Sequence, residues 1–440
     1  MTAKARPSTG SGQHPSTGSG QRPLPRIGPD SAPFWKAAKE GRLSLPWCLL
    51  CNRPHLPPGP LCPFCLGERL EWRPASGRGV VSSWTRVHKA WFPAFEGDIP
   101  YVVAQIELAE GPRLTAGLFD LGALGPRVGQ SVAVDFERVT AEIALPRFRP
   151  APEVLAASPR AGIGECPVWD ADRQRLYWID IAGRRMYRND AAGRFDGNWA
   201  LPHGLGSFAL RTGGGMIAAW AAGLGLIDPE AGEFTDIPSG APGIGPDFAL
   251  ERFNDGASDR RGRFWAGTLA RNLKDPVGRL YRIDPDLSVH PMADGLVLSN
   301  GIAWSLDDRT MYHCDSGLSA VFQYPFDLAS GAIGERRVFA DFASRRGRPD
   351  GCTVDAEGHL WVAAVEAGEI LRFAPSGALA GSLNFPVSTP TSLAFGDGDL
   401  RTLYVTSLRR DGTTEEDAGR LFALRPGVAG VPEPLFGGPP

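Results

Sequence analysis

Four of the seven cysteines are grouped in two short motifs. Cys48 and Cys51 form one CxxC pair, and Cys62 and Cys65 form a second pair after ten intervening residues. Each CxxC turn directs two thiolates to one point, so the two turns together supply the tetrahedral sulfur set that Zn²⁺ prefers. Four thiolates leave no open position, and we therefore predict a structural zinc ion. A redox CxxC would accompany a βαβ unit, which this region lacks.

A second group of polar side chains recurs at regular intervals over the last 290 residues. Each member lies 11–13 residues before a marker residue of a weak repeat. The group comprises Glu165, His203, Asn254, Asn300, Asp350 and Ser392. A single Asn-Gly or Asp-Gly pair is usually only a turn former. Recurrence in phase with an independent repeat favours a binding site instead.

The donor atoms of this group indicate its chemistry. Carboxylate and amide oxygens suit Ca²⁺, Mg²⁺ or Mn²⁺, and suit Zn²⁺ less readily. The carboxylates of Glu165 and Asp350 would balance a divalent charge. Such an ion polarises an ester carbonyl and acidifies bound water. The group therefore predicts a metal-assisted hydrolase, with Ca²⁺ as the preferred candidate ion.

The repeat that sets this phase predicts the fold. Its unit is a polar turn followed by a strand, and successive marker residues are 38–49 residues apart. The markers are Trp178, Met216, Trp265, Tyr312, Trp361 and Tyr404. This spacing is the length of one four-stranded propeller blade, so six blades fill residues 151–440. A β-sandwich with coincidental spacing is the alternative. In a propeller, equivalent inner positions converge on the central axis.

The first 150 residues predict three further segments. Residues 1–30 contain the heptapeptide PSTGSGQ twice, which cannot bury a core, so we predict a disordered tail. A short helix (33–42) and the cysteine motifs make a zinc ribbon over 31–75. Strand-like runs at 79–86, 101–108, 115–119 and 131–137 suit a small OB-type barrel over 76–150. The chain is therefore predicted to be all-β.

The propeller motifs resemble the regucalcin/gluconolactonase (senescence marker protein) family of six-bladed propellers. The resemblance covers about residues 154–436 and rests on GECPVWD, RFNDGASDRRGRFWAGT, GLVLSNGIAWS and PDGCTVDAEGHLWVA, which occur in that order. It implies that Glu165, Asn300 and Asp350 hold the metal and that Asp350 is also the acid/base. It implies further that Arg252 and Asn254 contact the substrate, a lactone. Cys166, after the glutamate, is expected to pack, or to act as a weak soft ligand.

The N-terminal part resembles a different family. PFWKAAKEGRL, the paired CxxC motifs, GRGVVSSWTRVHKAWFPAF and PYVVAQIELAEGPRL are similar to rubredoxin-like zinc-ribbon plus OB-fold proteins associated with acyl-CoA enzymes. The resemblance implies a module that handles acyl-CoA or binds an acyl-CoA enzyme. A ribbon and barrel could also bind nucleic acid through stacked aromatic residues, but aromatics in a small barrel are more often core.

Composition excludes several classes of partner. A net charge of −3 gives no general attraction to nucleic acid or to anionic membranes. No apolar run reaches the ~18–20 residues that span a bilayer, and the N-terminus has no apolar secretory segment. We therefore expect a cytoplasmic protein without nucleic-acid or membrane partners.

The leading hypothesis is a metal-dependent lactone hydrolase joined to an acyl-CoA-associated module. In it, Asp350 shuttles a proton and Arg252 orients substrate oxygens. One alternative is a Ca²⁺-binding propeller without turnover, and another is a phosphotriesterase on the same scaffold. Asp259, in an outer turn of the third blade, is expected to tolerate an Asp→Asn change with little effect.

Overall fold

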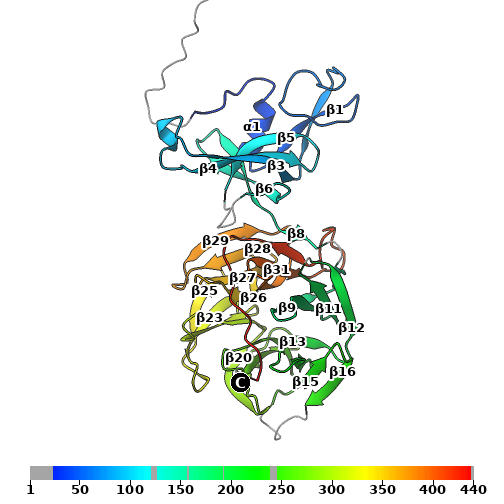
Figure 1. Ribbon diagram of the computed structural model, residues 1–440, viewed down its shortest axis with the longest axis vertical. Helices are drawn as coiled ribbons and strands as arrows, with labels where there is room; N and C mark the ends of the chain where they lie inside the picture. The colour runs from blue at the N-terminus through cyan, green and yellow to red at the C-terminus, as the bar shows by residue number, and fades with distance from the viewer. Residues whose placement is uncertain (1–22, 120–125, 156–157, 192, 238–244, 438–440) are drawn as a thin grey trace, which may run out of the picture. The chain divides into compact units, whose positions relative to one another are not determined.

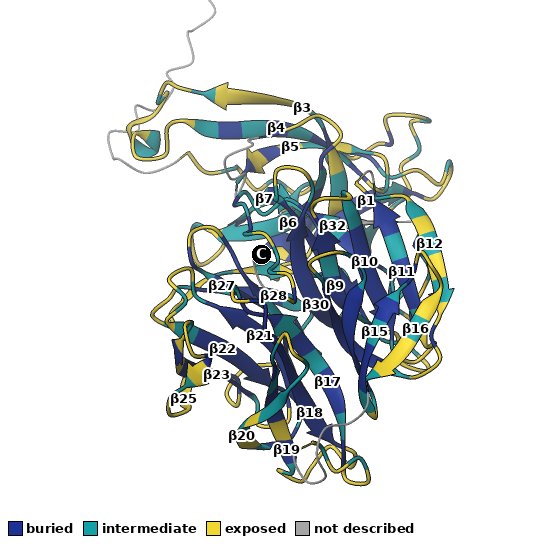
Figure 2. Ribbon diagram, turned by 60° about the horizontal axis from the view of Figure 1, so that its bottom comes forward, coloured by how far each residue is buried: buried dark blue, intermediate teal, exposed yellow. Residues whose placement is uncertain are grey.

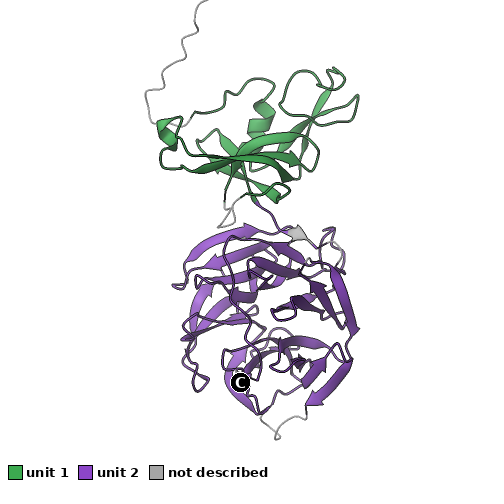
Figure 3. Cartoon of the chain, viewed as in Figure 1, with its two compact units in different colours: residues 1–120, 126–149 green, residues 121–125, 150–440 purple. Residues whose placement is uncertain are grey.

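A computed structural model describes residues 23–119, 126–155, 158–191, 193–237 and 245–437. The repeated heptapeptide of the predicted tail lies outside these residues. The chain divides into two compact units near residue 150, coloured separately in Figure 3. None of the helices among the described residues is long and apolar enough to cross a lipid bilayer.

The N-terminal unit begins with a helix and a two-stranded ribbon. Helix α1 (Ala32–Lys39) starts with a proline in its first turn and buries Phe34, Ala37 and Ala38. Strands β1 (Ser44–Cys48) and β2 (Leu70–Pro74) pair antiparallel and enclose the two CxxC turns between them. The predicted helix and zinc-ribbon fold are therefore present.

A closed five-stranded barrel completes this unit, in the order β3-β4-β5-β7-β6. The strands are β3 (Arg78–Val87), β4 (Tyr101–Leu108), β5 (Arg113–Leu118), β6 (Ser131–Arg138) and β7 (Ala144–Pro150). A short 3-10 turn, η1 (Pro93–Phe95), lies between β3 and β4. Residues along β4 alternate strictly between half-buried and buried, because one face of a barrel strand fills the interior. Val81, Ile106 and Phe148 form this core and are fully buried.

Six antiparallel sheets arranged around an axis form the propeller unit, as predicted (Figure 1). The inner strands are β9 (Gly164–Asp170), β13 (Leu205–Leu210), β17 (Glu251–Ser258), β21 (Ser299–Trp304), β26 (Arg348–Val354) and β30 (Pro390–Gly396). Neighbouring inner strands contact one another around the ring, including β30 against β9. These six strands position the candidate site.

All six marker residues of the repeat lie on the second strand of their blades. These strands are β10 (Arg175–Asp180), β14 (Met216–Trp220), β18 (Phe264–Ala270), β22 (Thr310–Asp315), β27 (Leu360–Val365) and β31 (Thr402–Ser407). The marker side chains are buried between adjacent blades. The spacing of the marker residues in the sequence therefore reflects the packing of each blade against the next.

Two further strands complete each blade on the outside, except in the fourth blade, which has three, β23, β24 and β25. Of the outer strands, β12 and β16 are largely exposed (Figure 2). The outer strands are β11 (Arg185–Asp190), β12 (Phe195–Ala200), β15 (Gly223–Asp228), β16 (Glu233–Ile237), β19 (Gly278–Ile283), β20 (Val289–Leu296), β23 (Ala320–Asp327), β24 (Ala332–Ile333), β25 (Arg337–Asp341), β28 (Glu369–Phe373), β29 (Leu379–Asn384), β32 (Phe422–Leu424) and β8 (Glu153–Val154). The last blade takes its outer strand, β8, from the start of the unit, so both ends of the propeller sequence meet in one sheet.

Buried aspartates hold the turns between the first two strands of two blades. Asp259 accepts hydrogen bonds from the backbone N–H groups of Arg261 and Arg263 with one oxygen, and from Trp265 Nε1 and Arg263 Nε with the other. Asp355 is held in the same way by Trp361 Nε1 at 2.8 Å and by Arg372. Both carboxylates are fully buried. The expectation that Asp259 is a dispensable turn residue is therefore wrong, because it bonds the turn to the blade core.

Candidate active site on the propeller axis

Each inner strand departs from regular pairing with its second strand. The shift falls between Glu165 and Val168 in β9 and between Leu205 and Ser207 in β13. The corresponding shifts in the other four blades release Asn254 and Asp255, Asn300 and Gly301, Asp350 and Gly351, and Thr391 and Ser392 from the ladder. A bulge turns the strand and re-aims its side chains. The shared bulge thus directs the in-phase polar residues toward one another.

A hydrogen-bonded chain of amides links the third and fourth blades. Arg252 Nη1 donates to Asn254 Oδ1 at 3.1 Å, and Asn254 Nδ2 donates to Asn300 Oδ1 at 2.7 Å. Asn300 Nδ2 in turn donates to Ser316 Oγ at 2.7 Å. These bonds orient the Asn300 oxygen toward Asn254, with one lone pair left for a further partner. The predicted substrate residues Arg252 and Asn254 and the predicted ligand Asn300 therefore lie in one network.

The carboxylates of Glu165 and Asp350 have few partners. Glu165 accepts one hydrogen bond, from the backbone N–H of Cys166 at 3.2 Å. Within the described part of the chain, no hydrogen bond reaches the carboxylate of Asp350, which is only 7% exposed. Burial raises the pKa of Glu165 well above its usual value, and the nearby Asp350 carboxylate raises it further. The pKa of Asp350 is also raised well above the ordinary range, first by burial and then by Asp255.

Asp255 is a third carboxylate near the axis, and the analysis of the sequence missed it. Burial raises its pKa to about 6, and its charge raises the pKa of both Glu165 and Asp350. In a regular strand Asp255 would point away from Asn254, because successive side chains alternate. The bulge cancels that alternation. The only signal in the sequence was its place between Asn254 and Gly256 in the RFNDG motif.

Two members of the in-phase group behave differently from the others. His203 precedes β13, its side chain is 54% exposed, and it faces Asp236 on the outer strand β16 at 3.5 Å. It does not join the axial residues. Ser392 does lie on an inner-strand bulge and lines the central cavity. The expected polar lining is therefore interrupted in the second blade.

Glycines beside the axial residues serve the packing of adjacent blades. A Cβ on Gly206 would lie 2.4 Å from the backbone oxygen of Asn254, and one on Gly301 would lie 2.4 Å from the backbone nitrogen of Cys352. A Cβ on Gly351 would lie 2.6 Å from Cα of Ser392. These glycines therefore allow the close approach of the neighbouring inner strand.

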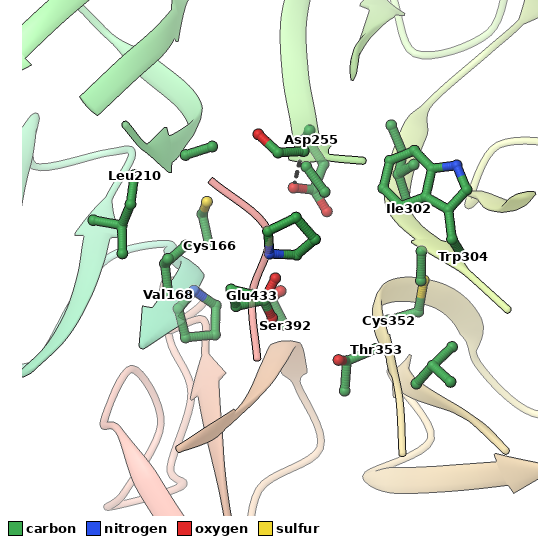
Figure 4. Close-up of a pocket in the computed structure, with 18 of the residues that line it drawn as sticks. Cys166, Val168, Leu210, Asp255, Ile302, Trp304, Cys352, Thr353, Ser392 and Glu433 are labelled. Carbon is green, nitrogen blue, oxygen red and sulfur yellow. Dashed lines mark hydrogen bonds between the residues drawn. The ribbon is translucent and has the colours of Figure 1, made fainter. Parts of the chain in front are cut away.

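A cavity of about 80 Å³ lies on the axis beyond the bulges. Figure 4 shows Asp255, Cys166 and Cys352 around it, with Glu433 entering from the C-terminal segment. Cys166 Sγ lies 3.6 Å from the carbonyl oxygen of Phe208, and the side chain is buried in the core between the first two blades. Of the two roles expected for Cys166, these contacts correspond to packing.

The C-terminal segment that contributes Glu433 is fixed at both ends. Ala356 N–H donates to the carbonyl of Ala429 at 2.8 Å at one end. At the other, Phe436 is buried and its N–H donates to the carbonyl of Leu210 at 2.7 Å. Burial raises the pKa of Glu433 to about 7. The segment therefore lines one end of the cavity as a fixed part of the fold.

The axial residues fit a hard divalent cation. Asp350 is buried and Glu165 is half-buried, the two interact through their like charges, and they accept one hydrogen bond between them from the described residues. Asn300 adds an oriented amide oxygen. A cation would remove the repulsion that raises the pKa of both carboxylates, and all three donors are oxygen atoms of the type that Ca²⁺, Mg²⁺ and Mn²⁺ prefer.

The four cysteines of the ribbon also form a site of suitable geometry. Their Sγ atoms all lie within 4.8 Å of one another, with Cys48 and Cys65 at 3.5 Å and Cys51 and Cys62 at 3.6 Å. Zn–S bonds of about 2.3 Å place two tetrahedral sulfurs about 3.8 Å apart. In each turn, the residue after the second cysteine donates its N–H to the carbonyl of the first cysteine at 2.9 Å. This arrangement fits a structural zinc ion.

Comparison with known proteins decides the family of the propeller. Residues 163–409, more than half of the chain, match the family described as the SMP-30/Gluconolactonase/LRE-like region. The chain belongs to this family. Residues 35–71 match the rubredoxin-like zinc ribbon domain of ChsH2, and residues 72–137 match its C-terminal OB-fold domain. Both resemblances inferred from the motifs are thereby confirmed.

Individual members of the family match the propeller over nearly their whole length. A 6-deoxy-6-sulfogluconolactonase of Pseudomonas putida is 40% identical over 63% of this chain and 95% of its own. Regucalcin of Gallus gallus is 35% identical, covering 64% and 97%. A pentonolactonase of Haloferax volcanii is 31% identical, covering 62% and 93%. The structure of a calcium-binding regucalcin from Agrobacterium tumefaciens superposes with a TM-score of 0.59 at 28% identity, covering 65% of this chain and 97% of that one.

Proposed function

We propose that this protein is a metal-dependent hydrolase of sugar-type lactones, with its active site on the propeller axis. The observation that carries the proposal is the convergence of two poorly partnered carboxylates, buried Asp350 and half-buried Glu165, with an oriented amide oxygen. The family match and the relatives named as lactonases support the reaction class.

Glu165, Asn300 and Asp350 would hold the divalent cation, with Ca²⁺ preferred and Mg²⁺, Mn²⁺ or Zn²⁺ as alternatives. When bound, the ion supplies Lewis-acid stabilisation of negative charge on the lactone oxygen. Asp350 accepts a proton from the attacking water, since no hydrogen bond from the described residues occupies its carboxylate.

Arg252 and Asn254 would orient the substrate. The Asn254 amide is fixed at both ends, by Arg252 and by Asn300, so its position is tied to that of a cation ligand. Arg252 donates only to the Phe253 carbonyl and to Asn254 among the described residues, which leaves further N–H groups of its guanidinium for substrate oxygens. Pre-organised donors of this kind lower the cost of placing a substrate.

For the N-terminal unit we propose association with an acyl-CoA enzyme. Its match to the ChsH2 ribbon and OB-fold domains supports this role. Large apolar side chains stand exposed at the two CxxC turns, among them Leu50 at 73%, Leu66 at 71% and Phe64 at 57%. Exposed apolar side chains that cluster on a protein surface often mark a site of contact with another protein.

The deciding experiment is a lactonase assay of metal-stripped protein after addition of Ca²⁺, Mg²⁺, Mn²⁺ or Zn²⁺. We expect no turnover of gluconolactone without metal and recovery with one or more ions. Recovery of metal binding, measured by calorimetry, without hydrolysis of any lactone would instead favour the binding-only propeller. Hydrolysis of a phosphotriester but of no lactone would favour the phosphotriesterase alternative.

A further inference from the structure

A second arginine lies close to Arg252 at the beginning of the third blade. Arg271 follows the last residue of β18, and its backbone N–H donates to the carbonyl of Leu250 at 2.8 Å. Its Nε donates to the carbonyl of Phe248 at 2.9 Å. The side chain is thus folded against the segment that leads into β17 and Arg252. This places two guanidinium groups on neighbouring strands, one of them bonded to the axial amide network.

Neither arginine forms an ion pair or a hydrogen bond with a carboxylate in the part of the chain that the structure describes. Arg252 donates only to carbonyl and amide oxygens, and Arg271 only to a carbonyl. Other arginines of the propeller are paired, as Arg263 is with Asp259 and Arg348 with Glu366. Burial lowers the pKa of Arg252, and the charge of Arg271 lowers it further, so the two cations repel one another, while the nearby Glu165 carboxylate acts in the opposite direction.

The acidic group near Arg252 is Glu165, a proposed ligand whose charge the bound cation would neutralise. The two guanidinium groups then present excess positive charge beside the axial site. Guanidinium groups bind sulfonate, carboxylate and phosphate oxygens through paired N–H donors, and partial burial strengthens such bonds. Arg252 is positioned by Asn254, and Arg271 is positioned by Phe248, so little side-chain freedom is left to lose on binding.

We propose that Arg252 and Arg271 together receive an anionic substituent of the substrate, so that the preferred substrate is a negatively charged sugar lactone. Within this pair, Arg271 is the residue that determines specificity, because Arg252 also belongs to the network around the cation site. The inference rests on the lactonase function proposed above and narrows its substrate class.

The test compares three lactones on the full-length, metal-loaded protein: neutral gluconolactone, a hexonolactone bearing a sulfonate, and one bearing a carboxylate. We expect kcat/KM for one anionic lactone to exceed that for the neutral lactone by about tenfold or more, as hydrogen bonds to charged groups allow. The preference should shrink with rising ionic strength, because salt screens the half-exposed pair. The ratio between the sulfonate and carboxylate lactones identifies which anion the pair prefers.

Arg271→Gln should reduce the ratio of anionic to neutral kcat/KM by about tenfold. Arg261→Gln is the matched control: it removes the same charge from an exposed arginine in the turn between β17 and β18, at the other end of these strands. It should leave the ratio unchanged. A wild-type protein that hydrolyses neutral gluconolactone at least as well as both anionic lactones would overturn the inference and leave the lactonase function intact.

A binding measurement distinguishes failure of this inference from failure of the proposed lactonase function. Calorimetry with the sulfonated sugar acid, the product of lactone opening, should show weaker binding to Arg271→Gln by about tenfold, whether or not the protein turns over any lactone. Equal binding by the variant and the wild type would overturn the inference. Absence of lactone hydrolysis together with Arg271-dependent binding would reject the proposed reaction but retain the anion subsite.

Discussion

The propeller contains two groups of buried carboxylates that differ in how they are satisfied. Asp259 and Asp355, in turns between strands, each accept hydrogen bonds from backbone N–H groups, from an indole and from an arginine. Glu165 and Asp350, on the axis, accept one hydrogen bond between them from the described residues. Asp350 and Asp355 lie on the same blade and are both buried, so burial alone does not explain the difference in their partners.

The difference distinguishes carboxylates that stabilise the fold from carboxylates that form the candidate active site. A buried carboxylate normally needs partners that offset its lost hydration, and the turn aspartates have them. The axial carboxylates remain under-partnered and close enough to repel one another, which is a cost that folding alone does not explain. Binding of a cation or a substrate would account for this cost. The predictions below test this contrast.

Asp350→Asn should have the largest effect. An amide cannot accept the proton, so we expect kcat to fall about 10²–10⁴-fold, the usual range for loss of a general base, even at saturating metal. Because the change removes one of two like charges, the metal-free variant should be at least as stable as the wild type near pH 7. Lactonase kinetics and thermal unfolding measure the two effects.

Full recovery of Asp350→Asn by excess cation would limit Asp350 to a ligand role. Wild-type activity without added metal would remove the proposed site. Zinc content is the internal control, since the ribbon cysteines are unchanged and one zinc per chain should remain.

Asp259→Asn should show the opposite pattern. The substitution leaves the Arg263 guanidinium and its hydrogen-bonded turn without a counter-charge in a fully buried position. Breaking one partner of such a pair costs about 3–5 kcal/mol of unfolding free energy. Denaturant unfolding should show this loss, while kcat of the folded fraction stays near wild type. Asp172→Asn, at an exposed position of another blade, is the matched control and should change neither. Equal stability of both variants would contradict the assigned role of Asp259.

Glu433 falls between the two groups, because it lines the axial cavity without a hydrogen bond from the described residues. Burial raises its pKa from an ordinary 4.5 to about 7. The folded protein therefore holds this proton more tightly than the unfolded chain does. Ionisation of Glu433 destabilises the fold progressively from pH 4.5 to about 7, by up to about 3 kcal/mol above that range. Glu433→Gln should remove this dependence.

The expected result is a higher melting temperature for Glu433→Gln than for the wild type at pH 8 and similar values at pH 4.5. Melting curves at several pH values provide the measurement. If the melting temperatures of the two proteins change in parallel with pH across this range, burial does not raise the pKa of Glu433. The residue would then not belong with the axial carboxylates.

Cys62→Ser should have the smallest effect on the propeller. The four ribbon thiols, like the axial carboxylates, are grouped closely enough to share one metal ion. We expect loss of the zinc ion by elemental analysis and local unfolding of the ribbon, because metal binding supplies much of the folding energy of such a site. Lactonase activity should persist. Zinc-free wild-type protein purified without chelator would reject the zinc assignment.

The sequence predicted the architecture because its periodic signal and its packing have the same cause. The marker residues, Trp178, Trp265 and Trp361 among them, recur at blade length since each fills the same space between blades. The phase count also led to Asn254, Asn300 and Asp350. It misplaced His203, because the second blade follows its predecessor at the shortest interval and begins its inner strand after that residue.

The positions of other site residues could not be predicted from the sequence, because they depend on contacts between different strands. Asp255 faces the axis only because of a bulge, and bulges are set by pairing with β18. Asp259 looked like an ordinary turn residue, since its partner Trp265 lies in the next strand. Glu433 belongs to a segment outside the repeat, so its neighbours could be known only from the folded ring.

The outer strand of the last blade has a consequence for biosynthesis. β8 precedes every blade in the chain, yet its partner β32 is made more than 260 residues later. At the usual 5–20 residues per second, a ribosome needs roughly ten seconds to a minute to cover that distance. The five complete blades, and most of the sixth, therefore emerge before the ring can close. Throughout this interval the ribbon and barrel, already fully synthesised, remain attached directly to the strand that closes the ring.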